Sequence, residues 1–250
     1  MRRRIFPLAK GIIVAAAFAF PSCAPHVETI REPVAPIHKA ERRPALAPKP
    51  NPDNIKAIEL IGDILDGSRT PMSKKTAVET LGMIAATGNL SDAMVLKAAQ
   101  ALLPLLHDED PGLRDSSVIS LGQLRYMDAW QYLADALKDP SPDVRRHAAE
   151  ALGKLKNRNS VGPLIGLSQD KDVNTRLGAV FALGEIKSPK SIGALIMALD
   201  DPALDVKIQA AVALGKLGDK EALPALKKHC RGKLKEAARA AIEDIENRQE

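Results

Sequence analysis

The chain has 250 residues, and its aromatic share of 3% is low. Leu and Ala dominate the apolar residues, which favours thin, closely packed helices over a β-sandwich or barrel. The net charge of +5 comes from the N-terminus, because residues 54–250 carry 27 basic and 27 acidic side chains. A neutral body argues against nucleic acid as a partner, since phosphate binding needs a basic surface.

Residues 1–22 have the pattern of a signal peptide. Arg2, Arg3 and Arg4 provide a positive start, and Gly11–Phe20 is an apolar run of ten residues. A run of this length is too short to span a bilayer, which takes ~20 residues, but it suits a signal-peptide core. We therefore expect export of the chain.

The leader ends in a motif that resembles the lipobox of bacterial lipoproteins, Phe20-Pro21-Ser22-Cys23. In that family the Cys becomes the lipidated first residue of the mature protein. Ser22 fits this pattern, whereas Phe20 and Pro21 depart from it. The resemblance implies a lipid on Cys23 and a periplasmic location, at the outer rather than the inner membrane because Ala24 follows. Ordinary cleavage to a soluble product and an uncleaved anchor are the alternatives.

Residues 23–53 form a predicted tether. Eight of the chain's 18 prolines lie between positions 21 and 53. Proline lacks a backbone donor and fixes φ, so this stretch favours an extended, polyproline-like spacer over a helix or strand. A ligand for a proline-binding partner is the alternative. The predicted organisation is a signal peptide (1–22), a tether (23–53) and a repeat domain (54–250).

The repeat domain is defined by a Leu-Gly pair that recurs every 31 residues. Each unit predicts two helices, such as Asp143–Leu155 followed by a helix through Val161, Leu164 and Leu167. One helix pair cannot bury its apolar face alone, so such units stack. The four pairs are Leu121-Gly122, Leu152-Gly153, Leu183-Gly184 and Leu214-Gly215.

Upstream, Ser73–Ile84 and Ser91–His107 predict one further helix pair, and Asn54–Leu65 and Lys233–Ile245 predict capping helices. The expected fold is all-α: a right-handed α-solenoid of about five HEAT-like helix pairs with capping helices, about twelve helices in all.

Two polar columns follow the same period. Asp143, Asn174 and Asp205 are candidate N-caps, because their side chains can accept from free helix N–H groups. A cation lies two residues after each of these candidates, and Arg114 occupies the same position in the preceding repeat. These cations predict an ion ladder between repeats, with Asp143, Asp172 and Asp205 as partners; a site for an anionic partner is the alternative. The cations are Arg114, Arg145, Arg176 and Lys207.

The repeats, for example DPSPDVRRHAAEALGKL, resemble the short HEAT-like repeats first associated with phycobilisome lyases, over residues 70–247. The resemblance is specific for fold and unspecific for function. It implies two enzymatic alternatives: a bilin lyase or maturation factor, and an oxidoreductase similar to deoxyhypusine hydroxylase. The hydroxylase uses His-Glu dipeptides as iron ligands, and none occurs here. We therefore expect no enzyme activity, catalytic residue, metal or cofactor.

In solenoids of this kind the second helices line the concave face, and in the central repeats their outward positions lack long charged side chains. The predicted function is a membrane-anchored scaffold that binds a protein partner on this face. Crowding of the inner helices is the alternative explanation for the missing charged side chains. Trp130 is also a candidate core residue, and Cys230 is expected to be a small buried hydrophobe. The predicted partner-binding strip is Trp130, Tyr132, Gly162, Gly166, Gly193, Ala194 and Met197.

Overall fold

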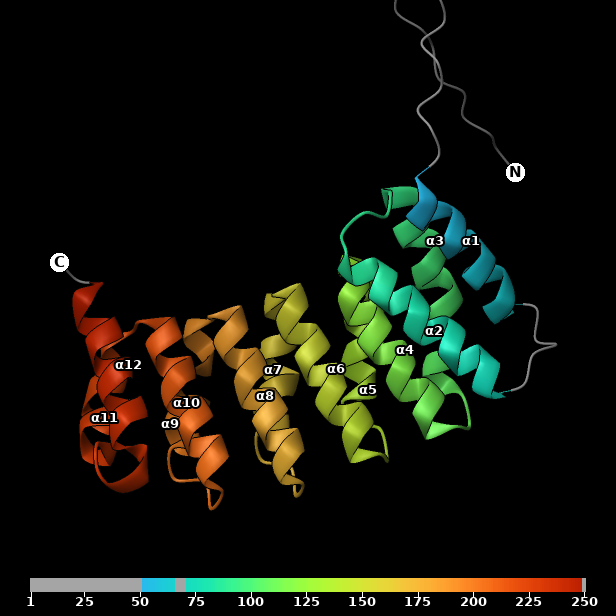
Figure 1. Cartoon of the computed structure of the whole chain (residues 1–250). Helices are drawn as coiled ribbons and strands as arrows, with labels where there is room; N and C mark the ends of the chain where they lie inside the picture. The colour runs from blue at the N-terminus through green and yellow to red at the C-terminus, as the bar shows by residue number, and fades with distance from the viewer. Residues whose placement is uncertain (1–50, 66–70, 249–250) are drawn as a thin grey trace, which may run out of the picture. The chain divides into compact units, whose positions relative to one another are not determined.

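The computed structural model describes residues 51–65 and 71–248. The signal peptide, Cys23 and nearly all of the tether lie outside these residues. Within them every regular element is helical, with twelve α-helices, six short 3₁₀ helices and no strand (Figure 1). The all-α prediction is confirmed, as are five helix pairs with one further helix at each end.

The first helices of the five pairs are α2 (Pro71–Ala86), α4 (Pro111–Leu124), α6 (Pro142–Leu155), α8 (Val173–Ile186) and α10 (Leu204–Leu217). The second helices are α3 (Asp92–Leu102), α5 (Trp130–Ala136), α7 (Val161–Leu167), α9 (Ile192–Ala198) and α11 (Leu223–His229). The end helices are α1 (Pro52–Leu65) and α12 (Lys235–Asn247). The 3₁₀ helices are Leu103–His107, Met127–Ala129, Arg158–Ser160, Pro189–Ser191, Lys220–Ala222 and Gly232–Leu234.

The helices of this part pack in two layers. First helices contact one another in succession from α2 through α4, α6, α8 and α10 to α12 (Figure 1). From α5 onward, each second helix packs on the first helix of the following unit. The repeated leucines lie between the layers and are fully buried, as the periodicity predicts: Leu121, Leu152, Leu183 and Leu214.

The glycine after each leucine lies where neighbouring first helices approach most closely. A Cβ on Gly153 would lie 2.9 Å from the Cα of Ala182 on the next helix. On Gly184 it would lie 2.7 Å from the Cβ of Ala213. Carbon atoms normally approach to ~3.5–4.0 Å, so only glycine permits this spacing. The Leu-Gly pair therefore combines a core contact with a helix–helix contact.

The helix starts differ from the sequence prediction. Asp143, Asn174 and Asp205 are not N-caps; they lie inside the first turn. The N-cap of α6 is Ser141, and Pro142 begins that helix because its fixed φ suits the first position. Asp172 caps α8 by accepting from the Thr175 N–H at 2.8 Å.

The predicted second helix Ser91–His107 is also interrupted. Its α-helical part ends at Leu102, and residues Leu103–His107 continue as a 3₁₀ helix. Pro104 lies in the first turn of that segment. Its ring has no N–H to donate to the preceding turn, which explains the change of helix type.

Candidate functional site

The predicted partner-binding strip is largely at the surface of α5, α7 and α9. Tyr132 is 46% exposed and Met197 is 62% exposed. Gly162, Gly166 and Gly193 are exposed, and a Cβ on any of them would meet nothing within 4 Å. The second-helix face therefore has open space above its three glycines.

Two members of the strip are less accessible. Ala194 is half-buried, and it lines a cavity of about 300 Å³ together with Met197 and residues that follow α7. Trp130 is half-buried and packs against the core. Trp130 thus has the core contacts that its column suggested, and Tyr132 is the exposed aromatic residue of the strip.

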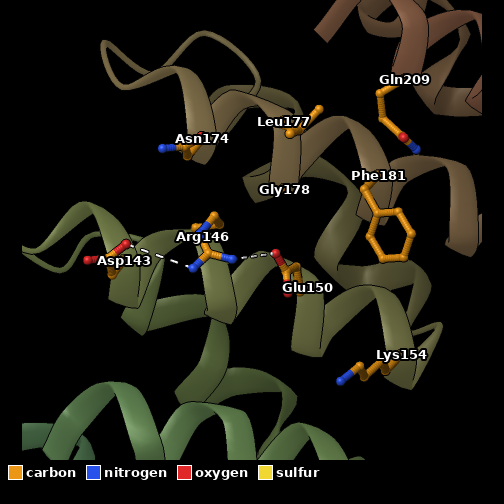
Figure 2. A pocket seen from close by; sticks show the side chains of 9 residues that line it. All are labelled: Asp143, Arg146, Glu150, Lys154, Asn174, Leu177, Gly178, Phe181 and Gln209. Atoms are coloured by element: carbon orange, nitrogen blue, oxygen red, sulfur yellow. Dashed lines mark hydrogen bonds and ion pairs between the residues drawn. The ribbon is translucent and has the colours of Figure 1, made fainter. Parts of the chain in front are cut away.

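A second cavity, of about 620 Å³, lies on the outward face of the first helices (Figure 2). We call it the first-helix groove. Residues from three successive helices line it, because the glycine contacts hold α6, α8 and α10 close together. The lining residues are Asp143, Arg146, Glu150, Lys154, Asn174, Leu177, Gly178, Phe181 and Gln209.

The groove has apolar and charged sides. Leu177 and Phe181 on α8 provide its large apolar side chains, while α6 provides charged ones. Arg146 on α6 donates from Nη1 to Glu150 at 3.0 Å, and its Nη2 lies 3.8 Å from Asp143 (Figure 2). These ion pairs lie in the α6 wall of the groove, opposite the apolar side chains of α8.

The aromatic ring of the groove is held by a neighbouring cation. The Nζ atom of Lys216 on α10 lies 5.6 Å from the centroid of the Phe181 ring. The same ammonium group pairs with Glu185 on α8. A cation over a ring face is attracted by the ring's quadrupole, which favours one orientation of the side chain. Phe181 is therefore a positioned apolar surface.

This groove was not predicted from the sequence, because the prediction rested on the outward positions of the second helices alone. The signal was present in one column of the first helices, in which Ile119, Glu150, Phe181 and Val212 recur at 31-residue steps. This column changes from charged on α6 to apolar on α8 and α10. Phe181 is also the chain's only phenylalanine beyond position 20.

Three members of the cation column, the arginines, form an ion ladder between repeats, but with other partners than predicted; within the described residues the ladder does not extend to Lys207. The guanidinium Nε atoms lie 2.7–3.0 Å from Asp139, Asp170 and Asp201, not from Asp143, Asp172 and Asp205. Each arginine also donates to two carbonyl groups before its own helix, as Arg145 does to Asp139 and Pro140. The three pairs are Arg114–Asp139, Arg145–Asp170 and Arg176–Asp201.

The ladder carboxylates are held in their ionised form. Burial alone would raise the pKa of Asp170, but hydrogen bonds from Arg145 and from the Asp172 N–H outweigh it. The pKa of Asp170 therefore lies below its usual range, and the pKa of Asp201 is lowered in the same way. Since the three arginines are paired within the fold, the ladder has a structural role.

Cys230, the C-cap residue of α11, packs against the core as expected of a small hydrophobe, but it is only half-buried. No cluster of His, Cys, Asp and Glu in residues 51–65 and 71–248 has the makeup of a metal site. Among the helices described, none is long and apolar enough to cross a bilayer.

Comparison with known structures supports the solenoid fold. The chain is similar to YibA of Escherichia coli, with a TM-score of 0.60, 21% identity and coverage of 78% of this chain and 69% of that one. It is also similar to a designed armadillo repeat protein in complex with the peptide (KR)4, with a TM-score of 0.54, 21% identity and coverage of 75% and 98%.

The complex of CpcE and CpcF of phycocyanin lyase from Nostoc sp. PCC7120 matches at a TM-score of 0.44 and 18% identity, with coverage of 87% and 94%. No curated protein sequence matches the chain. The family profile described as HEAT repeats matches residues 99–172 and 161–245. These matches cover more than half of the chain, which therefore belongs to the HEAT-repeat family.

Proposed function

We propose that this protein is a non-catalytic scaffold that binds a segment of a partner protein in the first-helix groove. The observation that supports this is the cavity of about 620 Å³ with Leu177 and Phe181 exposed to it. Aromatic side chains in concave sites contribute a large share of binding energy, because they bury much area at little entropic cost. The designed armadillo repeat protein in complex with the peptide (KR)4 supports the proposal, because a similar fold holds a peptide there.

The strip on α5, α7 and α9 is the second candidate surface. Its open glycines would let a partner backbone approach closely, and Met197 and Tyr132 offer exposed apolar area. Its cavity is about 300 Å³, half the volume of the first-helix groove. We therefore assign the strip a weaker or additional contact.

Capture of partners from living cells by crosslinking distinguishes the two surfaces. Phe181→Arg places a charge in the first-helix groove, Gly193→Arg places one on the strip, and Glu236→Arg on α12 is the control. We expect Phe181→Arg to lose at least one partner that the parent chain and the control retain. If only Gly193→Arg loses it, the strip is the binding surface. A bilin or iron bound to the purified chain would support an enzyme instead.

We further propose that the scaffold is exported and held at a membrane by lipid on Cys23, with the predicted tether (residues 23–53, of which Pro52 and Asp53 belong to α1) as the spacer. This rests on the sequence of the leader alone. One acyl chain gives marginal membrane binding, so the multiple chains of a bacterial lipoprotein matter. Cys23→Ser should move the protein from the membrane fraction to the soluble fraction. If Cys23→Ser is still cleaved and stays with the membrane, lipid at this residue is excluded.

A further inference from the structure

The first-helix groove has opposite charges at its two ends. Asp143 lies in the first turn of α6 and is 69% exposed in its side chain, and Asp205 occupies the same position on α10. Lys154 lies in the last turn of α6 and is exposed. Both Asp143 and Lys154 line the groove (Figure 2). The groove is therefore acidic at the N-terminal end of α6 and basic at its C-terminal end, while the equivalent of Asp143 on α8 is the neutral Asn174.

The span between these charges fits a short helix. Asp143 and Lys154 are eleven residues apart on α6, which corresponds to ~16 Å along the helix axis. Leu177 and Phe181 on the neighbouring α8 are four residues apart and so share one face. An apolar pair between two opposite charges is what an amphipathic helix of about three turns would complement.

Helix dipoles and side-chain charges favour the same orientation of a partner helix bound in the groove. First helices repeat in register and run in one direction, so their positive ends lie together at the Asp143 end. A partner helix antiparallel to α6 and α8 would place its own negative C-terminal end there. Because of its dipole, a helix is most stable with acidic residues in its first turn and basic residues in its last turn. In this orientation the partner's bases meet Asp143 and its acids meet Lys154.

From this agreement we infer the occupant of the groove, an inference that rests on the proposed function. It is a partner helix of about three turns, antiparallel to α6 and α8. It has an acidic residue in its first turn, apolar residues at i and i+4 against Leu177 and Phe181, and a basic residue in its last turn. Arg146 and Glu150 satisfy each other in the wall, so the partner need not supply charge at the centre.

Two fluorescent 16-residue peptides of identical composition test the inference by anisotropy with the purified chain. Both are Ala-based with Leu at i and i+4 in the centre. One has Glu in the first turn and Arg in the last, and the other has these charges exchanged. A lactam staple on the face away from the groove matches their helicity, which circular dichroism verifies. The second peptide can make both rim ion pairs only by binding parallel to α6, which sets its dipole against those of the first helices. We therefore expect the first peptide to bind about threefold more tightly, as a dipole contribution of ~0.3–1 kcal/mol would give.

A charge-exchanged protein provides the matched control. In Asp143→Lys/Lys154→Glu both changes are at exposed positions, and the preference between the peptides should reverse. Phe181→Ala should weaken both peptides equally. If neither peptide binds, or if the double variant keeps the parent's preference, the inferred helix is wrong. Partner capture that still depends on Phe181 would then preserve the proposed function, whereas capture indifferent to Phe181 would refute that function itself.

Discussion

Gly184→Ala tests whether the repeated glycines set the spacing of the first helices. The new Cβ would lie 2.7 Å from the Cβ of Ala213 and 3.0 Å from its Cα. Relief to an ordinary contact of ~3.5–4.0 Å requires α8 and α10 to separate by about 1 Å. Overpacking of this kind costs ~1–3 kcal/mol, and the better helix propensity of Ala returns up to ~1 kcal/mol.

We therefore expect Gly184→Ala to lower stability by about 1–2 kcal/mol. For a fold of this size that corresponds to a fall in Tm of roughly 2–8 °C. The matched control is Gly193→Ala on α9, where a Cβ meets nothing within 4 Å. This variant keeps only the propensity gain and should be neutral or more stable by up to ~1 kcal/mol. Thermal and urea unfolding followed by circular dichroism at 222 nm measure both.

A compensating change isolates the contact. Ala213→Gly removes the atom that meets the new Cβ of Gly184→Ala. The double variant should be more stable than the sum of the two single changes predicts, because the 2.7 Å contact exists only when both methyl groups are present. The rescue should be partial, since the Cα of residue 213 stays 3.0 Å from the new Cβ. If Gly184→Ala raises stability as much as Gly193→Ala does, the close approach does not constrain the helices and our explanation of the Leu-Gly period is incorrect.

Two further changes test the core and the ladder. Leu183→Ala should cost ~2–5 kcal/mol, because Leu183 is fully buried, and denaturant unfolding measures the loss. Asp170→Asn should cost about 1–3 kcal/mol at pH 7. Because the folded-state pKa of Asp170 is lowered, its contribution is present above the unfolded carboxyl pKa of ~3.9 and is lost as pH falls below it. The stability gap between the parent and Asp170→Asn should thus narrow as pH falls from ~3.9 through the lower folded-state pKa; a gap that does not change with pH across this range would contradict the assigned role.

The periodicity of the sequence predicted the fold because each column has one repeated physical role. Leu152 and its equivalents are buried, and the glycine after each meets the next helix. Helix starts were less predictable, because several nearby residues can cap. Asp143 is a good N-cap type, but Pro142 before it fits the first helical position and moves the start to Ser141.

The helix ends were also beyond the sequence analysis. Arg125, Lys156 and Lys187 follow α4, α6 and α8 with positive φ, and Gly218 does so after α10. Only glycine signals this left-handed conformation by its type, so three of the four ends gave no local sign. They share the 31-residue period, and the period is what would have identified them.

The ladder partners could not be derived from spacing in the chain alone. Each arginine reaches an aspartate 25 residues later, so the pair depends on how one unit stacks on the next. The aspartates also accept from a backbone N–H two residues on, as Asp170 does from Asp172. This local turn orients the carboxylate independently of the arginine. Asp139 and Asp201 make the same turn, at Ser141 and Ala203.

The glycine column connects stability to binding, because the same close contacts bring three helices into one groove. Gly153→Ala would place a Cβ 2.9 Å from the Cα of Ala182 and force α6 away from α8, which both line the groove. Gly82→Ala makes a similar contact, 3.2 Å from the Cα of Ser120, but between α2 and α4, neither of which lines the groove.

Both substitutions insert one methyl group against a backbone atom and should cost similar stability. Only Gly153→Ala should weaken binding of the Glu-first peptide, measured where circular dichroism shows both variants fully folded. A shift of about 1 Å between α6 and α8 would move Lys154 away from the Leu177 and Phe181 side chains. The bound peptide helix must contact all three residues at once. Equal loss of affinity in both variants would show that binding follows general stability. Loss confined to Gly153→Ala would show that helix spacing, set by residues that contact no ligand, determines the shape of the groove.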